Sequence, residues 1–183
     1  NLIMKKITFL FFILPITLFG QLSDSLEVMK ADKNVSYKNY EKLLFRATNY
    51  IFENPVDLKS QEFISATQIV NFCMNIETEM GIPTFGNFFK SLTNDDKQQF
   101  LYIVAMINYG LNQKINYNRN LECKPKKGEK YSEQVDVKEV QIEGAKIVLK
   151  YIGNKNNNVK ISSQTKKYLK AYENGNLEEI FFE

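Results

Sequence analysis

The stretch that decides the fold is Phe100-Leu101-Tyr102-Ile103-Val104-Ala105-Met106-Ile107, which is apolar almost all the way round a helical projection. A helix of this kind is stable where neighbouring elements cover all of its sides. Lys97 and Gln98 precede the run, which is much shorter than the roughly 20 apolar residues that a membrane-spanning helix needs. The sequence therefore predicts a central buried helix.

Two amphipathic helices are predicted upstream of this run. Ser36 is a favourable N-cap for the first, and Asn54-Pro55 ends it, whereas Asp57 or Ser60 caps the second, and Gly81 followed by Pro83 ends it. Their apolar residues follow helical spacing: Tyr40, Leu43, Leu44, Ala47 and Ile51 in the first, and Ala66, Ile69, Val70, Cys73, Ile76 and Met80 in the second.

The connection to the central run carries its own helical signals. One or two turns packed on the core are predicted from Phe85, Phe88, Phe89 and Leu92. Thr93 followed by Asp96 is spaced like a capping box, which predicts that the central helix begins there.

Downstream, residues 112–130 are rich in Asn, Lys, Pro and Gly, and they predict a long surface loop. Residues 134–142 fit either a strand or a helix, and we favour the helix because no second strand is available for pairing. Val140–Ile152 predicts a helix closed by Gly153, and Ser162 or Ser163 caps a last helix that ends at Gly175. The final apolar residues, Leu177, Ile180, Phe181 and Phe182, predict a short tail docked on the body.

These elements predict one all-α domain over residues 21–183, either a compact helical bundle or an irregular helical array. That domain has 163 residues (183 minus 20), which is enough to bury roughly 70% of the surface of the unfolded chain.

Residues 1–20 are predicted to be a signal peptide. Lys5 and Lys6 precede an apolar run over residues 7–19, and Gly20 precedes a polar Gln21. The ending Phe19-Gly20-Gln21 resembles the export signals of secreted and periplasmic proteins in Bacteroidota. Residues 1–3 precede Met4 and are interpreted as a gene-prediction artefact. We therefore expect a periplasmic or secreted protein with no membrane anchor after cleavage, and export makes a nucleic-acid partner improbable.

Charge is distributed unevenly along a chain with 24 basic and 21 acidic residues. Residues 21–111 carry a net charge of −3 (8 basic, 11 acidic), residues 112–170 carry +8 (14 and 6), and residues 171–183 carry −4 (0 and 4). The basic segment could bind an anionic partner such as an acidic protein or an envelope polymer. Its exposed centre contains Lys124, Lys126, Lys127 and Lys130. The alternative is that these charges solvate helix faces and pair with acids of the same domain.

The composition excludes several chemistries. The chain has no histidine, which removes Ser-His-Asp and Cys-His catalytic sites and the commonest metal ligand. No glycine-rich phosphate loop, Cys-x-x-Cys motif or acidic calcium loop is present, so no cofactor or metal is expected. A glycosidase-like pair of carboxylates remains possible, and the acids considered for it are Glu77, Glu79, Asp95 and Asp96.

Two cysteines in an exported chain suggest a disulfide between Cys73 and Cys123. Such a bridge would pin the basic loop to the core. Against it, Cys73 lies on an apolar stripe, where a buried free thiol behaves as a small hydrophobic residue. We favour the bridge.

Two functional classes remain. The first is an exported, non-catalytic binding protein, including an immunity- or inhibitor-type protein, and the residues favour it. The alternative is a carboxylate-based hydrolase that acts on an envelope polymer.

Overall fold

The structure is a computed structural model that describes residues 21–76, 80–92 and 96–182. Over these ranges the chain is all-α and forms no strand. The α-helices are α2 (Gln21–Ala31), α3 (Tyr37–Glu53), α4 (Gln61–Met74), α5 (Gly86–Ser91), α6 (Asp96–Tyr117), α7 (Val135–Gly153), α8 (Ser163–Glu173) and α9 (Leu177–Phe181), with short 3₁₀ helices η2 (Tyr131–Glu133) and η3 (Lys155–Asn157).

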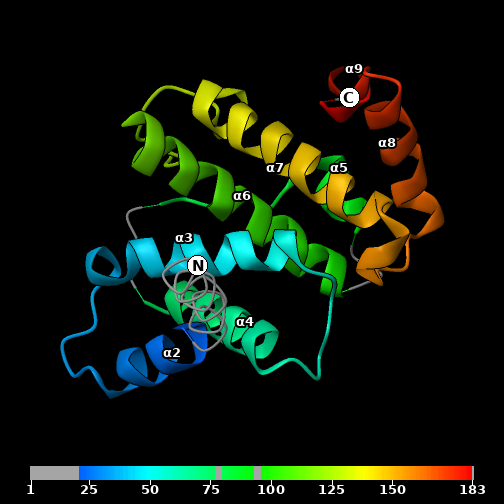
Figure 1. Cartoon of the computed structure of the whole chain (residues 1–183). Coiled ribbons are helices and arrows are strands. Elements are labelled where there is room, and N and C mark those ends of the chain that lie inside the picture. The colour runs from blue at the N-terminus through cyan, green and yellow to red at the C-terminus, as the bar shows by residue number, and fades with distance from the viewer. Residues whose placement is uncertain (1–20, 77–79, 93–95, 183) are drawn as a thin grey trace, which may run out of the picture.

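Helix α6 lies at the centre of the molecule (Figure 1). It packs against α3 on one side and α7 on the other, so that α2 and α4 gather beside α3, and α8 and α9 gather beside α7. Tyr102, Val104, Ala105 and Met106 of α6 are completely buried. The predicted central buried helix is thus confirmed, and the array around it is irregular rather than a regular bundle of parallel helices.

Helix α6 is longer than predicted. The sequence suggests a loop from residue 112, whereas the helix continues to Tyr117, so the loop covers residues 118–130. The reason is that Leu111 and Ile115 extend the buried face, and the polar residues between them lie on sides that solvent reaches. A run of polar residues therefore does not predict the end of a helix where the apolar residues keep their helical spacing.

The serine caps confirm three predicted helix starts. Ser36 precedes α3, whose end falls at the predicted Asn54. Of the two alternatives before α4, Ser60 is the cap, and its side chain accepts a hydrogen bond from the Phe63 N–H. Ser162 caps α8 in the same way, with the Thr165 N–H as donor.

Helix α4 is shorter than predicted, because it ends at Met74 and leaves Ile76 and Met80 outside the helix. Asn75 occupies the C-cap, and its side-chain amide donates to the Asn71 carbonyl (2.8 Å). Side-chain bonds of this kind compete with continued helix. The capping box proposed for the start of α6 involves Thr93, which lies outside the described residues.

The ambiguous segment 134–142 is helical, since α7 begins at Val135. Val135 is 77% exposed, whereas Val137 and Val140 are buried, which is the spacing of a helix. Asp136 lies in the first turn, where the helix dipole favours an acid. The predicted choice of helix over strand is confirmed.

The C-terminal tail docks on the body as predicted. Leu177 and Phe181 of α9 are buried, and the Phe181 ring lies 5.3 Å from that of Phe88 on α5. The Phe88 ring also meets the rings of Tyr102 (4.9 Å) and Tyr168 (5.0 Å) at edge-on angles. Edge-to-face pairs are worth about 0.5–1.5 kcal/mol beyond their buried area. One phenylalanine thus joins α5, α6, α8 and α9.

Helices α6 and α7 are in close contact at Gly144. A Cβ atom added to Gly144 would lie 2.6 Å from Met106 Cγ and 3.2 Å from Met106 Cα and N. No larger residue fits there without moving the backbone of α6. Glycine is therefore required here because the crossing leaves no room for a Cβ atom. It is kept although glycine destabilises a helix by about 1 kcal/mol relative to alanine.

We expect Gly144→Ala to lower the free energy of unfolding by about 1–3 kcal/mol, because overpacking outweighs the gain in helix propensity. Thermal unfolding followed by circular dichroism measures this. Gly110→Ala on α6 is the matched control, since its added Cβ meets the flexible end of Met80 at 3.1 Å. The control variant should leave the free energy of unfolding unchanged or raise it. Equal losses of this free energy in both variants would show that the crossing is not tight.

Candidate binding surface

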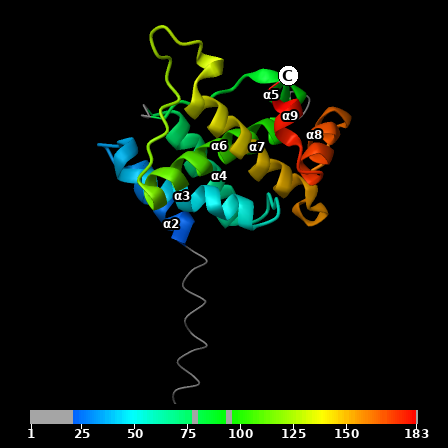
Figure 2. The same cartoon turned by 90° about the horizontal axis from the view of Figure 1, so that it is seen from above.

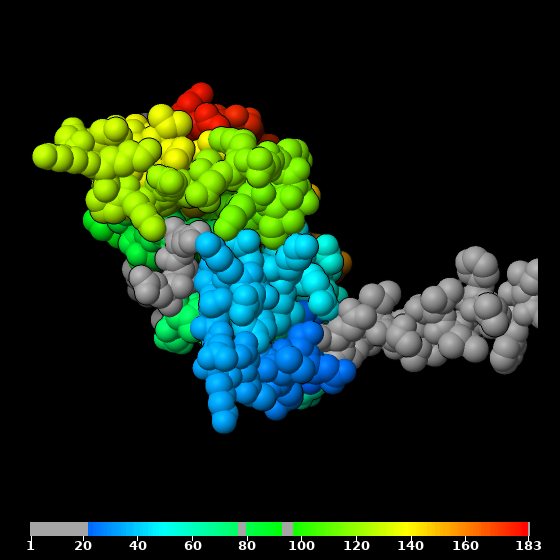
Figure 3. All heavy atoms as spheres, turned by 90° about the vertical axis from the view of Figure 1, so that its left-hand side faces the viewer, coloured from blue at the N-terminus to red at the C-terminus, as the bar shows by residue number. Residues whose placement is uncertain are grey.

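The loop over residues 118–130, which we call the lysine loop, joins α6 to α7 and projects from the helical body (Figure 2). It carries all four lysines that the sequence selects. Lys124, Lys126, Lys127 and Lys130 are exposed, and the loop protrudes from the molecular surface in the space-filling view (Figure 3).

The base of the lysine loop is fixed to the start of α7. Leu121 and Cys123 are buried, and the Glu122 N–H donates to the Asp136 carboxylate (3.0 Å). The Cys123 thiol donates to the Asp136 carbonyl (3.5 Å), and the Tyr131 hydroxyl donates to the Cys123 carbonyl (3.1 Å). These contacts fix the path of the chain on the approach to the lysines.

Gln134 fixes the next part of the loop. Its side chain is 3% exposed. With the amide oriented so that both of its polar atoms are satisfied, its nitrogen donates to the Lys124 carbonyl (2.8 Å) and its oxygen accepts from the Lys126 N–H (2.8 Å). Gly128, with φ at +84°, provides the left-handed residue that turns the chain back. The loop backbone is therefore held, while the lysine side chains extend into solvent.

The lysines of the loop differ in how they are neutralised. Lys130 Nζ lies 3.4 Å from Glu133, and Lys138 Nζ lies 2.6 Å from the other oxygen of the same carboxylate. Hydrogen bonds from Lys138 first, and then from Lys130, lower the pKa of Glu133. Within the described ranges, Lys124, Lys126 and Lys127 form no ion pair. Three positive charges thus remain open to a partner.

Elsewhere the basic segment pairs with acids of its own domain. Arg119 forms a bidentate pair with Glu139 (2.9 Å for each hydrogen bond), and the Tyr109 hydroxyl donates to the same carboxylate (2.6 Å). The hydrogen bond from Arg119 is the main reason that the pKa of Glu139 is lowered. Lys146 bridges Glu143 (2.7 Å) and Glu178 (3.1 Å), and Lys114 pairs with Glu41. The alternative interpretation, pairing within the domain, therefore applies to Lys114, Arg119 and Lys146 but not to Lys124, Lys126 and Lys127.

The predicted disulfide is not present, because the structure contains Cys73 and Cys123 as buried free thiols. Cys73 lies on the inner face of α4, and Cys123 is engaged by Asp136 at the start of α7. Hydrogen bonds from the loop backbone, rather than a covalent bridge, hold the lysine loop to the body.

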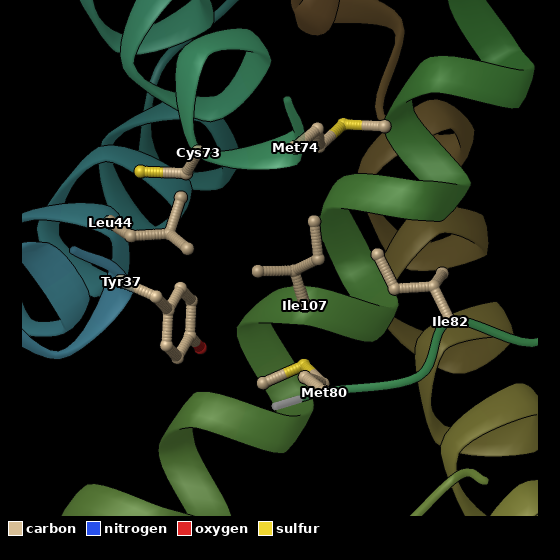
Figure 4. A pocket seen from close by; sticks show the side chains of 7 residues that line it. All are labelled: Tyr37, Leu44, Cys73, Met74, Met80, Ile82 and Ile107. Carbon is tan, nitrogen blue, oxygen red and sulfur yellow. The ribbon is translucent and has the colours of Figure 1, made fainter. Parts of the chain in front are cut away.

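Cys73 borders a small apolar cavity of about 80 Å³ between α3, α4 and α6. Two methionines, Met74 and Met80, also line it, which raises the question of a soft-metal site. Figure 4 shows that the Cys73 sulfur points away from the sulfurs of Met74 and Met80. The three sulfur atoms do not converge on one point, so the cavity is a packing space.

The carboxylates considered for the hydrolase alternative are not described by the structure. Glu77, Glu79 and Asp95 lie outside the described residues, and α6 begins at Asp96, whose side chain is not described. Among the residues that are described, no cluster of three Cys, Asp or Glu side chains could hold a metal ion. No helix in the same ranges is long and apolar enough to cross a membrane.

Comparisons with known proteins identify no relative: no family model, no curated protein and no solved structure matches this chain. The function must therefore be inferred from the side chains themselves.

We expect both cysteines to react slowly with thiol reagents in the native protein. Burial raises the pKa of Cys73 from 9.0 to about 11 and that of Cys123 to about 12, so neither forms a thiolate at neutral pH. Two thiols should be titrated in denaturant without reductant. Finding none until a reductant is added would show that the bridge exists.

The same pKa shifts predict a loss of stability in alkali. The unfolded thiols ionise from about pH 9, whereas the folded thiols keep their protons up to about pH 11 to 12, so a rising pH favours the unfolded state. Cys73→Ala should make the free energy of unfolding less dependent on pH between about 8 and 10, measured by urea denaturation. Buried tyrosines add to the slope at higher pH, because burial also raises the pKa of Tyr151 to about 12.

Proposed function

We propose that this chain is an exported, non-catalytic binding protein, periplasmic or secreted, whose lysine loop contacts an anionic partner. An immunity- or inhibitor-type protein is one form that such a function takes. The observation that carries the proposal is the open charge at Lys124, Lys126 and Lys127 on a backbone that Gln134 and Asp136 hold in place.

A fixed backbone supports binding in a specific way. A loop that is already ordered loses less conformational entropy when a partner binds it than a flexible loop would. Loops on a rigid scaffold are also where binding residues concentrate. The lysine side chains themselves stay flexible. The loop therefore suits a partner with several carboxylates better than a single ligand of fixed shape.

An acidic protein surface is the partner that fits best. Val135, at the first position of α7, follows the lysine loop and is 77% exposed. An exposed apolar side chain beside several cations suits a protein interface, in which apolar contacts lie within a polar rim. An anionic envelope polymer is the other candidate, because it would use the lysines without needing Val135.

The lysine loop is tested with a variant that carries glutamine at Lys124, Lys126, Lys127 and Lys130. Immobilised polyglutamate serves as the carboxylate probe. Binding should weaken roughly tenfold, since exposed ion pairs are worth about 0.2–1 kcal/mol each. Wild-type binding should fall as salt rises. The melting temperature should hardly change, because the one ion pair lost among the described residues is the exposed Lys130–Glu133 contact.

The control variant places glutamine at Lys33, Lys42, Lys59 and Lys150, four exposed lysines on other parts of the surface. Both variants lose the same net charge. If both weaken binding equally, net charge rather than the lysine loop is responsible, and the proposed surface is wrong. Export is tested separately by mass analysis of the extracytoplasmic product, which should begin at or near Gln21; an uncleaved N-terminus would contradict it.

A further inference from the structure

A groove of about 620 Å³ lies away from the lysine loop, between the segments around residues 56–58 and 158–160 and the helices α4 and α6. This volume is within the range of about 300–1,000 Å³ that is usual for small-molecule sites. It is several times larger than the packing cavity beside Cys73. The groove is therefore large enough to hold a ligand.

The floor and walls of the groove are mainly apolar. Its apolar side chains are Val56, Leu58, Phe63, Phe100, Leu101 and Val159. Phe63 and Leu101 are almost fully buried, whereas Leu58 is 64% exposed at the rim. An alkyl chain lying here would cover an exposed leucine and contact an aromatic and aliphatic floor, which is favourable at about 25 cal/mol per Å² of apolar surface buried.

The described lining of the groove includes lysines and no acid. Lys97 and Lys160 belong to it, and Lys160 is exposed. Asp57 lies outside the lining, in the neighbouring turn, where its carboxylate accepts a hydrogen bond from the backbone N–H of Lys59 (2.9 Å). An apolar floor with the exposed Lys160 beside it suits a ligand that combines a chain with one anionic group.

Hydrogen bonds fix the walls of the groove in advance. The Val56 N–H donates to the Asn157 carbonyl (3.2 Å), which joins the two segments that form one side. The Gln98 side chain donates to the Lys160 carbonyl (2.8 Å) and ties the second of these segments to α6. The groove thus exists before a ligand arrives, which lowers the entropic cost of binding.

We propose that this groove binds a single-chain alkyl carboxylate, with its chain along the apolar floor and its carboxylate near Lys160. This inference is independent of the lysine loop. It assigns to the protein a small-molecule site for an amphipathic anion in addition to the surface that contacts a macromolecule.

The experiment measures the binding of dodecanoate, below its micelle concentration, to the purified protein by isothermal titration calorimetry. Dodecyltrimethylammonium has the same chain with the opposite charge, and acetate has the head group without the chain. Dodecanoate should bind at one site, several-fold more tightly than dodecyltrimethylammonium, because Lys160 favours one charge and opposes the other. Acetate should not bind measurably, because it lacks the apolar chain.

Two variants locate the site. Asn71→Trp places a bulky side chain in the groove from an exposed position of α4 and should abolish dodecanoate binding without lowering the melting temperature. Lys160→Gln should weaken dodecanoate binding several-fold and leave dodecyltrimethylammonium binding unchanged or tighter. Lys150→Gln is the charge-matched control and should bind both compounds as the wild type does.

The proposal is overturned if dodecanoate does not bind, if both dodecyl compounds bind equally, or if Asn71→Trp binds dodecanoate normally. The variant with glutamines in the lysine loop should retain full dodecanoate affinity. The outcome here is therefore separate from that of the partner-binding experiment.

Discussion

The close crossing of α6 and α7 at Gly144 and Met106 is the constraint on which the other elements depend. It places the Tyr102 hydroxyl of α6 within hydrogen-bond distance of the Gln141 carbonyl on α7 (2.9 Å). The Gln141 side chain in turn donates to the carbonyls of Pro83 (3.2 Å) and Phe85 (2.9 Å), which sets the chain entering α5. Phe88 of α5 then packs with α8 and α9. A single close approach between two helices thus orders the C-terminal half of the fold.

The same pair of helices determines where the lysine loop lies. Because α6 and α7 are neighbours along the chain, the loop joins the end of one to the start of the other and must turn back within a short distance. Asp136 and Gln134, at the first turn of α7, supply the hydrogen bonds that fix its backbone. Among the described residues, Lys124, Lys126 and Lys127 form no ion pair, although Glu129 lies in the same loop. The groove lined by Lys97 and Lys160 is instead formed where α6 begins.

The all-α class could be predicted from local signals, because helix starts depend on short-range chemistry. Ser60 and Ser162 show this, since each side chain accepts a hydrogen bond from an N–H three residues later. The end of α4 and the extension of α6 could not be predicted, because Asn75 ends a helix through a side-chain hydrogen bond whereas Asn112 does not.

The exposed lysines could be identified by composition alone. The roles of Gln134 and Asp136 could not, because these residues act through contacts with the loop that periodicity does not encode. The groove was missed for the same reason, since it joins four separate segments of the chain.

The central claim is that the lysine loop is held by α7 while its lysines remain free, and amide hydrogen exchange tests it most directly. The Glu122 and Lys126 N–H groups, bonded to Asp136 and Gln134, should exchange slowly, whereas the Lys127 and Gly128 amides at the turn should exchange at the rate of an unfolded peptide. Gln134→Ala should remove the protection at Lys126 and leave that at Glu122. Free exchange of every amide from 118 to 130 in the wild-type protein would contradict the account, because the loop would then be a flexible tether rather than a fixed binding surface.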